Sequence, residues 1–283
     1  MGTQGTRRRL GAYRLLGEIG RGSTAVVHLG MDSFGREVAI KELSDDFAGE
    51  QEARLRLARE IEAQRRVDSP YVACLLDAGV DAGRPYVVTQ HVPGQPLGDL
   101  VEAYGPLRGE RLLRFARGLV LGLAAVHDAG VLHRDVAPGN VIVLGDRPTL
   151  IDFGIAQAAG ADQITRPGMV IGTPAYMAPE LIEGERAAAA ADVFSWAATV
   201  AYAATGRHPF GRGTLHGVCF RILRGKADLE GVPEPVASLL KLGLRRDPAT
   251  RPSARWFAGA LAQWTVGLAE RNREVTVRHR AVA

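Results

Sequence analysis

Two short polar motifs near the middle of the chain constrain its fold more than any other feature. His133-Arg134-Asp135-Val136-Ala137-Pro138-Gly139-Asn140 contains a carboxylate and an amide five residues apart, and Asp152-Phe153-Gly154 follows the apolar segment Pro148–Ile151. Magnesium takes carboxylate and amide oxygens from a few side chains and completes its shell with phosphates and water. Asn140 and Asp152 suit that need, which leaves Asp135 free to accept a proton from an attacking hydroxyl.

A glycine-rich segment lies between two segments that we expect to be strands. Its sequence is Gly20-Arg21-Gly22-Ser23-Thr24-Ala25-Val26-Val27. Glycines let backbone N–H groups come close to phosphate oxygens. A Rossmann site would need a helix after the glycines, and here a strand is expected instead. Taken alone, the segment is equally consistent with an ordinary hairpin turn.

Lys41 is one of only three lysines in a chain with 35 basic residues. It ends the segment Val38-Ala39-Ile40-Lys41 on the next expected strand, where its ammonium could pair with phosphates if a carboxylate held it in place. Glu60, nineteen residues later on an expected helix, is the candidate carboxylate. Without the other motifs, a surface lysine and a surface glutamate would explain both residues equally well.

The chain divides into a strand-rich part and a helix-rich part on either side of Pro93-Gly94. Alternating apolar residues and one charged helix over 50–67 come first, and apolar spacings of three and four, as from Leu112 to Val126, follow. The fold class is therefore α+β: a small β-rich N-lobe (13–92), a larger mainly helical C-lobe (93–264), and basic tails at 1–12 and 265–283. We expect strands at Tyr13–Ile19, Ala25–Met31, Glu37–Leu43, Val72–Leu76 and Pro85–Val92, and later helices at Asp192–Thr205, Thr214–Leu223, Pro235–Leu242 and Ala254–Trp264.

Composition excludes several classes of protein. Hydrophobic residues at 46% and charged residues at 23% are typical of a folded protein. The longest apolar stretches are far shorter than the ~20 residues of a membrane span, and no apolar region of a secretion signal follows Arg7-Arg8-Arg9. A net charge of +4 is too mild to imply nucleic acid, and Cys74 and Cys219 fit no disulfide framework. We therefore expect a cytoplasmic protein that spans no membrane and binds no nucleic acid.

With these motifs in this order, the chain resembles the eukaryotic-like Ser/Thr protein kinases of bacteria from about Tyr13 to Trp264. The resemblance implies a bilobal protein kinase fold that binds ATP with Mg²⁺, or with Mn²⁺, between its lobes. Asp135 would orient the acceptor hydroxyl, and Lys41 would pair with the α- and β-phosphates and with Glu60. Asn140 and Asp152 would hold the metal. The residues implied to bind ATP are Gly20, Gly22, Ser23, Val27, Ala39, Lys41, the gatekeeper Thr89, the hinge from Gln90 to Val92, and Ile142.

The second half of the chain indicates a protein substrate. Gly172–Glu180 resembles the substrate-docking end of an activation segment, which small-molecule kinases such as aminoglycoside phosphotransferases are not expected to carry. The resemblance also implies that Asp192 anchors the catalytic loop and that Arg251 pairs with Glu180. Arg134 is expected to respond to a phosphate on the activation segment. Thr173 is expected to contact Asp135, which leaves Thr165 as the autophosphorylation site, modified in trans if two copies associate.

Three positions depart from the family pattern. Ala137 stands where Ser/Thr kinases have a lysine on the γ-phosphate, Gly139 stands where tyrosine kinases have an arginine, and Gln64 replaces an apolar residue behind the helix. A lost transition-state cation costs on the order of a hundredfold in rate. The prediction is a Ser/Thr protein kinase, and the alternative is a pseudokinase that acts as a scaffold. His127, His133, His208 and His216 show no metal-ligand spacing and are expected to be structural.

Overall fold

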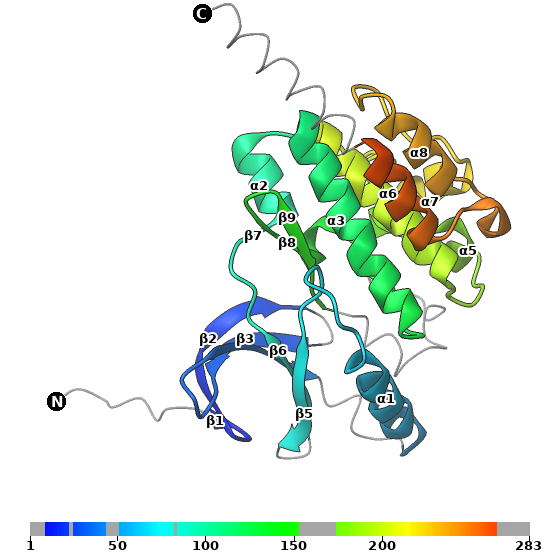
Figure 1. The fold of residues 1–283 in the computed structure, drawn as a ribbon. Coiled ribbons are helices and arrows are strands. Elements are labelled where there is room, and N and C mark those ends of the chain that lie inside the picture. The colour runs from blue at the N-terminus through cyan, green and yellow to red at the C-terminus, as the bar shows by residue number, and fades with distance from the viewer. Residues whose placement is uncertain (1–8, 23–24, 44–50, 82–83, 153–173, 265–283) are drawn as a thin grey trace, which may run out of the picture.

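The computed structural model describes residues 9–22, 25–43, 51–81, 84–152 and 174–264, and it has two lobes (Figure 1). The N-terminal lobe is a curled six-stranded antiparallel sheet with strand order β1-β2-β3-β4-β6-β5, and helix α1 lies beside it. Its elements are β1 (Arg9–Leu10), β2 (Tyr13–Arg21), β3 (Ala25–Met31), β4 (Glu37–Leu43), α1 (Gln51–Gln64), β5 (Leu75–Asp81) and β6 (Arg84–Gln90). The α+β bilobal fold is therefore confirmed, while the exact lobe and tail limits stay predictions.

The C-terminal lobe is mainly helical, with a small three-stranded sheet at its junction with the N-lobe (Figure 1). Its helices include short 3₁₀ turns, labelled η, and a further helix over 254–264. The labelled elements are β7 (Gln95–Pro96), α2 (Leu97–Tyr104), α3 (Gly109–Asp128), η2 (Pro138–Asn140), β8 (Val141–Leu144), β9 (Arg147–Leu150), η3 (Pro174–Tyr176), α5 (Pro179–Ile182), α6 (Ala189–Thr205), α7 (Leu215–Leu223), α8 (Val236–Gly243) and η4 (Pro248–Thr250).

Most of the predicted elements are confirmed, and one strand is misplaced. The prediction of a strand at Val72–Leu76 is wrong, because β5 runs from Leu75 to Asp81. Val72 instead makes an isolated parallel bridge with Leu150 of β9. Backbone bonds from Ala73 N to Leu150 O and from Leu150 N to Tyr71 O accompany that bridge. Val72 and Ala73 thus tie the N-lobe to the C-lobe, and only Leu75 and Leu76 of the predicted strand enter the sheet, as the start of β5.

Helix α6 is the centre of the main hydrophobic core. Every residue from Ala191 to Ala204 is buried, as expected for a helix that is apolar on all sides. Gly206 ends the helix in the left-handed conformation, with φ of +72°, and its N–H donates to Tyr202 O. Among the helices of the described residues, none is both long and apolar enough to cross a bilayer.

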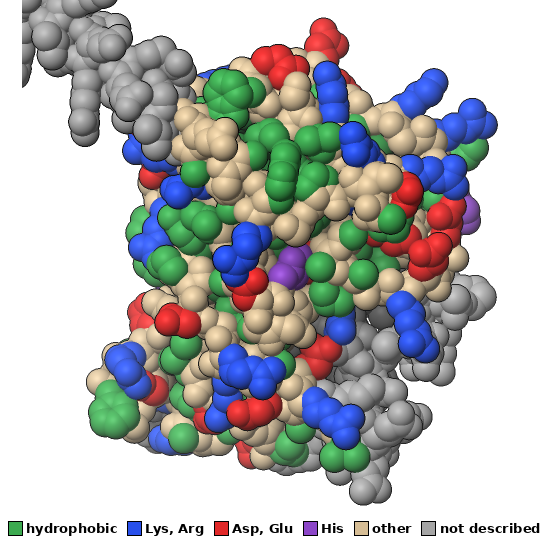
Figure 2. All heavy atoms as spheres, turned by 45° about the vertical axis from the view of Figure 1, so that its right-hand side comes forward, with side chains coloured by type: hydrophobic (Ala, Val, Ile, Leu, Met, Phe, Trp, Pro, Cys, Tyr) green, Lys and Arg blue, Asp and Glu red, His purple; other side chains and the backbone are tan. Residues whose placement is uncertain are grey.

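The surface of the C-lobe exposes several large apolar side chains. Figure 2 shows hydrophobic side chains gathered over the upper part of one face, with basic and acidic side chains interspersed around them. Phe220 of α7 and Trp256 of the 254–264 helix are 56% and 47% exposed. Charge of one sign does not dominate the face drawn there.

Candidate active site

One face of the N-lobe sheet brings together the residues expected to bind ATP. Directly opposed residues of an antiparallel pair lie on the same face of a sheet. The register pairs Gly20 with Val27, Val27 with Lys41, and Ala39 with Thr89. Because Ala39 and Lys41 are two residues apart on β4, all five share that face. Ser23 lies outside the described residues.

Lys41 and Glu60 do not form the expected ion pair. Lys41 Nζ lies 3.5 Å from Asp152 Oδ1, and Glu60 Oε1 lies 2.8 Å from Arg134 Nη2. The Glu60 prediction is therefore wrong in this structure, because Arg134, also about one-fifth exposed, competes successfully for the same carboxylate. Both ion pairs cross from the N-lobe to the C-lobe.

The catalytic loop holds Asp135 and Asn140 against each other. Asn140 Nδ2 donates to Asp135 Oδ2 at 2.7 Å and to the Asp135 carbonyl at 2.9 Å. Ile151 N donates to the Asn140 carbonyl, so Asn140 is fixed beside the residue that precedes Asp152. The structure therefore brings Asp135, Asn140, Asp152 and Lys41 together, as the motifs predict.

The oxygen donors at this site suit a metal ion that is shared with phosphates. Within the described residues, no group of three or more His, Cys, Asp or Glu side chains could enclose a metal ion. A carboxylate from Asp152 and an amide oxygen from Asn140 are hard ligands, which magnesium accepts when phosphate and water oxygens complete its shell. The residues present thus fit Mg²⁺ together with a bound nucleotide.

Asp192 anchors the backbone of the catalytic loop from helix α6. Its Oδ2 accepts from His133 N at 2.9 Å, and its Oδ1 accepts from Arg134 N at 2.7 Å. Arg134 has a φ of +65°, a left-handed conformation that is strained for a residue with a side chain. The two hydrogen bonds that its N–H and the N–H of His133 donate to one buried carboxylate stabilise that strained backbone immediately before Asp135.

His127 is structural, as expected, but its contact with Asp192 was not predicted from the sequence. Its Nε2 lies 2.9 Å from Asp192 Oδ2, so its ring donates to the carboxylate that holds the loop. The sequence signal available was only its place in the last turn of α3, six residues before His133. His133 itself is buried, donates from Nε2 to Ile151 O, and accepts at Nδ1 from Asp135 N. Burial lowers the pKa of His133, so the ring stays neutral in the structural role expected of it.

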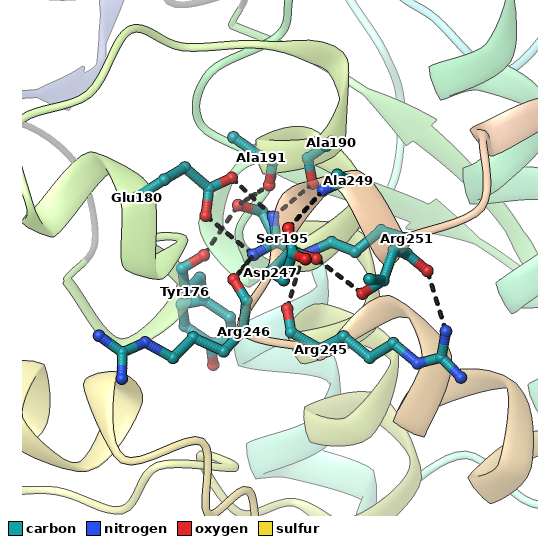
Figure 3. Close-up of polar contacts among 11 residues, drawn as sticks. Tyr176, Glu180, Ala190, Ala191, Ser195, Arg245, Arg246, Asp247, Ala249 and Arg251 are labelled. Atoms are coloured by element: carbon teal, nitrogen blue, oxygen red, sulfur yellow. Dashed lines mark hydrogen bonds and ion pairs between the residues drawn. The ribbon is translucent and has the colours of Figure 1, made fainter.

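Glu180 and Arg251 form the predicted salt bridge (Figure 3). The Arg251 guanidinium is bidentate, with its Nη1 2.6 Å from Glu180 Oε1 and its Nη2 2.8 Å from Glu180 Oε2. The Arg251 side chain is 0% exposed and the Glu180 side chain is 5% exposed. The carbonyls of Ala190, Arg245 and Arg246 accept its other hydrogen bonds. Figure 3 shows how this pair joins the chain after the activation segment to η4 and α6.

The three departures from the family pattern have different surroundings. Ala137 is buried at 1% exposure, whereas Gly139 is exposed, and a Cβ there would meet nothing within 4 Å in the part of the chain that the structure describes. Gln64 is buried at 3% exposure, and among the described residues its Nε2 finds no hydrogen-bond partner. Thr165 and Thr173 lie outside the described residues.

Comparisons with known proteins agree with this geometry. The family described as "Protein kinase domain" matches residues 13–260. The "Probable serine/threonine-protein kinase PkwA" of Thermomonospora curvata is 39% identical over 87% of this chain and 33% of that protein. The "Serine/threonine-protein kinase AfsK" of Streptomyces griseus is 38% identical over 89% of this chain and 31% of that protein. The chain thus spans about a third of the length of these curated relatives.

Solved structures show the same fold. The crystal structure of the Mycobacterium tuberculosis PknI kinase domain is 25% identical, with a TM-score of 0.71 over 92% of this chain and 98% of that one. Rad53 in complex with AMP-PNP is 23% identical, with a TM-score of 0.72 over 86% of this chain and 63% of that one, and supports the fold alone. On the family match and the shared bilobal fold, the chain belongs to the protein kinase family.

Proposed function

We propose that the chain is an ATP- and Mg²⁺-dependent Ser/Thr protein kinase that transfers the γ-phosphoryl group of ATP to protein hydroxyls. One arrangement carries the proposal: Asn140 holds the Asp135 carboxylate at 2.7 Å, while Lys41 and Asp152 face each other at 3.5 Å. Sequence similarity to proteins named as Ser/Thr protein kinases supports it.

ATP would lie against the face of the sheet that carries Lys41. Val27, Ala39 and Ile142 would contact the adenine, with Thr89 as gatekeeper, and the backbone from Gln90 to Val92 would bond it. Gly20 and Gly22 would let backbone N–H groups approach the phosphates. Lys41 would move from Asp152 to the α- and β-phosphates, which offer it more negative charge than one carboxylate.

The chemistry requires positioning more than covalent participation. Asp135 would accept a hydrogen bond from the acceptor hydroxyl, whose oxygen attacks the γ-phosphorus in line with the leaving oxygen of ADP. A P–O bond forms to the acceptor, the bond to the β,γ-bridging oxygen breaks, and the hydroxyl proton passes to Asp135. When bound through Asn140 and Asp152, Mg²⁺, or Mn²⁺ in its place, would neutralise phosphate charge.

The acceptor would be a Ser or Thr of a protein in the cytoplasm, and Thr165 of a second copy would be one such acceptor. Phosphate on Thr165 would draw Arg134 away from Glu60 and free Glu60 for Lys41, because a phosphate offers Arg134 a stronger bidentate partner. We expect neither nucleic acid nor a membrane among the partners. The docking segment Gly172–Glu180 supports a protein substrate over a small molecule.

The test is transfer from labelled ATP to a mixed panel of proteins, followed by analysis of the phosphorylated amino acids. Label on serine and threonine that depends on Mg²⁺ and disappears in Asp152→Asn would support the proposal. Label on an aminoglycoside instead, or on tyrosine alone, would contradict it.

A pseudokinase scaffold is the second candidate, and Ala137 favours it. Neither Ala137 nor Gly139 supplies a cation to the γ-phosphate, and the burial of Ala137 gives a longer side chain no open space there. ATP that raises the melting temperature of the protein without any phosphate transfer would favour this candidate.

A further inference from the structure

The face of the N-lobe sheet opposite to Lys41 carries a small apolar core that ends in charged side chains. The buried residues of that core come from β1, β4 and β6 and are Leu10, Val38, Ile40, Tyr86 and Val88. The next residue of β4 on this face is Glu42, and its diagonal neighbour on β3 is His28. Both are buried, with exposed fractions of 7% and 6%.

Glu42 is bonded from two strands at once. His28 Nε2 lies 3.2 Å from Glu42 Oε2, and Arg84 Nη1 of β6 lies 3.1 Å from Glu42 Oε1. The His28 and Glu42 side chains are each only 8% exposed, whereas Arg84 reaches the surface. One carboxylate therefore ties β3, β4 and β6 together.

The charged layer continues onto β2, the first strand of the glycine-rich hairpin. Glu18 is directly opposite His28, and Arg21 and Glu42 are both opposite Val26. Arg21 Nε donates to Glu18 Oε1 at 2.8 Å. We call these five residues the charged layer: Glu18, Arg21, His28, Glu42 and Arg84.

Stability alone does not explain why the carboxylate of Glu42 is buried at this place. Apolar side chains of similar volume usually stabilise a fold as well as a buried ion pair does, because desolvation offsets the attraction. The position of the charged layer in the sheet indicates its role more clearly. Arg21 is the neighbour of Gly22, and Glu42 is the neighbour of Lys41, so the layer lies directly behind the residues that would contact the phosphates of ATP.

We propose that His28 and Glu42 are positioning residues for ATP: their side-chain contact fixes β3, the second strand of the glycine-rich hairpin, on the strand that carries Lys41. This proposal rests on the proposed function, because it assigns the layer a role in that same nucleotide site. A hairpin that is already fixed loses less conformational freedom when phosphates bind. The pair should therefore affect ATP affinity more than the chemical step.

The experiment measures the dissociation constant for Mg²⁺–ATP, kcat and the melting temperature for four variants: His28→Leu, Glu42→Leu, the double variant, and His28→Gln. Each single leucine variant should weaken ATP binding roughly tenfold, with kcat at saturating ATP within about twofold of wild type. The double variant should bind about as weakly as each single one, because either substitution alone already removes the contact between His28 and Glu42. His28→Gln keeps an N–H donor toward Glu42 and should restore most of the affinity.

Leu10→Ala is the matched control, since it weakens the same small core at β1, away from the charged layer. It should lower the melting temperature and leave the affinity for ATP unchanged. Leucine variants that lower the melting temperature but bind ATP like wild type would overturn the proposal, and so would a Leu10→Ala variant that loses as much affinity. Wild-type protein that binds no ATP would instead overturn the proposed function, whatever the variants do.

Discussion

Gly139 is the residue in the catalytic loop where a missing charge can be replaced. It is exposed, its φ is not in the left-handed region, and a Cβ there would meet no atom of the described residues within 4 Å. We predict that Gly139→Arg raises kcat on the order of tenfold or more, because a cation would then face the charge that develops on the γ-phosphate. Steady-state kinetics with a protein substrate measure the effect. Gly139→Gln, of similar length but uncharged, is the control, and an arginine variant no faster than it would contradict the prediction.

His208 makes the stability of the C-lobe sensitive to acid. Burial and the nearby Arg212 lower the pKa of His208 below its usual value, and Tyr176 Oη donates to its Nδ1 at 2.8 Å. The His208 ring is therefore protonated less readily in the folded state than in the unfolded state. The free energy of unfolding consequently falls as the pH falls below about 6.5. Buried His133, whose pKa is also lowered, acts in the same direction.

We predict that the free energy of unfolding decreases between about pH 7 and pH 5, and that His208→Asn shows a smaller decrease. Asparagine keeps a hydrogen-bond acceptor for Tyr176 without a group that titrates in this range. Urea unfolding at a series of pH values is the measurement. Identical pH dependence in both proteins would show that His208 contributes nothing to the effect.

At the scale of structural elements, the packing of α5 against the segment after η4 depends on the buried ion pair of Glu180 and Arg251. Glu180→Ala would leave the Arg251 guanidinium buried without its charge partner, and we predict a loss of about 3–5 kcal/mol of unfolding free energy. Denaturant unfolding measures it.

Arg246 and Glu183 provide the matched exposed pair. Their side chains are 62% and 40% exposed and lie 2.7 Å apart. Glu183→Ala should change the free energy of unfolding by less than about 1 kcal/mol. Equal losses from Glu180→Ala and Glu183→Ala would mean that burial does not determine the importance of the first pair.

The sequence predicted elements and contacts well where a single signal, such as the hydrophobic period of a helix or strand, decided the outcome. Alternation and the 3.6-residue period predicted β2 to β4 and the long helices, and the motif order predicted the meeting of Asp135, Asn140 and Asp152. It failed where two partners compete. Glu60 pairs with Arg134 and not with Lys41, and spacing along the chain does not show which cation comes nearer. It also missed His127, whose partner Asp192 is 65 residues away.

At the scale of the whole molecule, contacts between the lobes involve the residues of the proposed nucleotide site. The ion pairs Lys41–Asp152 and Glu60–Arg134 both cross between lobes, and the backbone around Val72 and Ala73 is bonded to β9. The backbone contacts involve none of the proposed site residues, whereas each ion pair includes a side chain that ATP or a phosphate on Thr165 would also bind. Nucleotide and phosphorylation would therefore act on the same interface.

The central claim is that this chain transfers phosphate through Asp135. Intact-mass analysis of wild type and Asp135→Asn after incubation with Mg²⁺–ATP tests it most directly. We predict that wild type gains the mass of at least one phosphoryl group, that Asp135→Asn gains none on its own, and that ATP still raises the melting temperature of the variant. Equal phosphorylation of both proteins, or of neither, would contradict the claim.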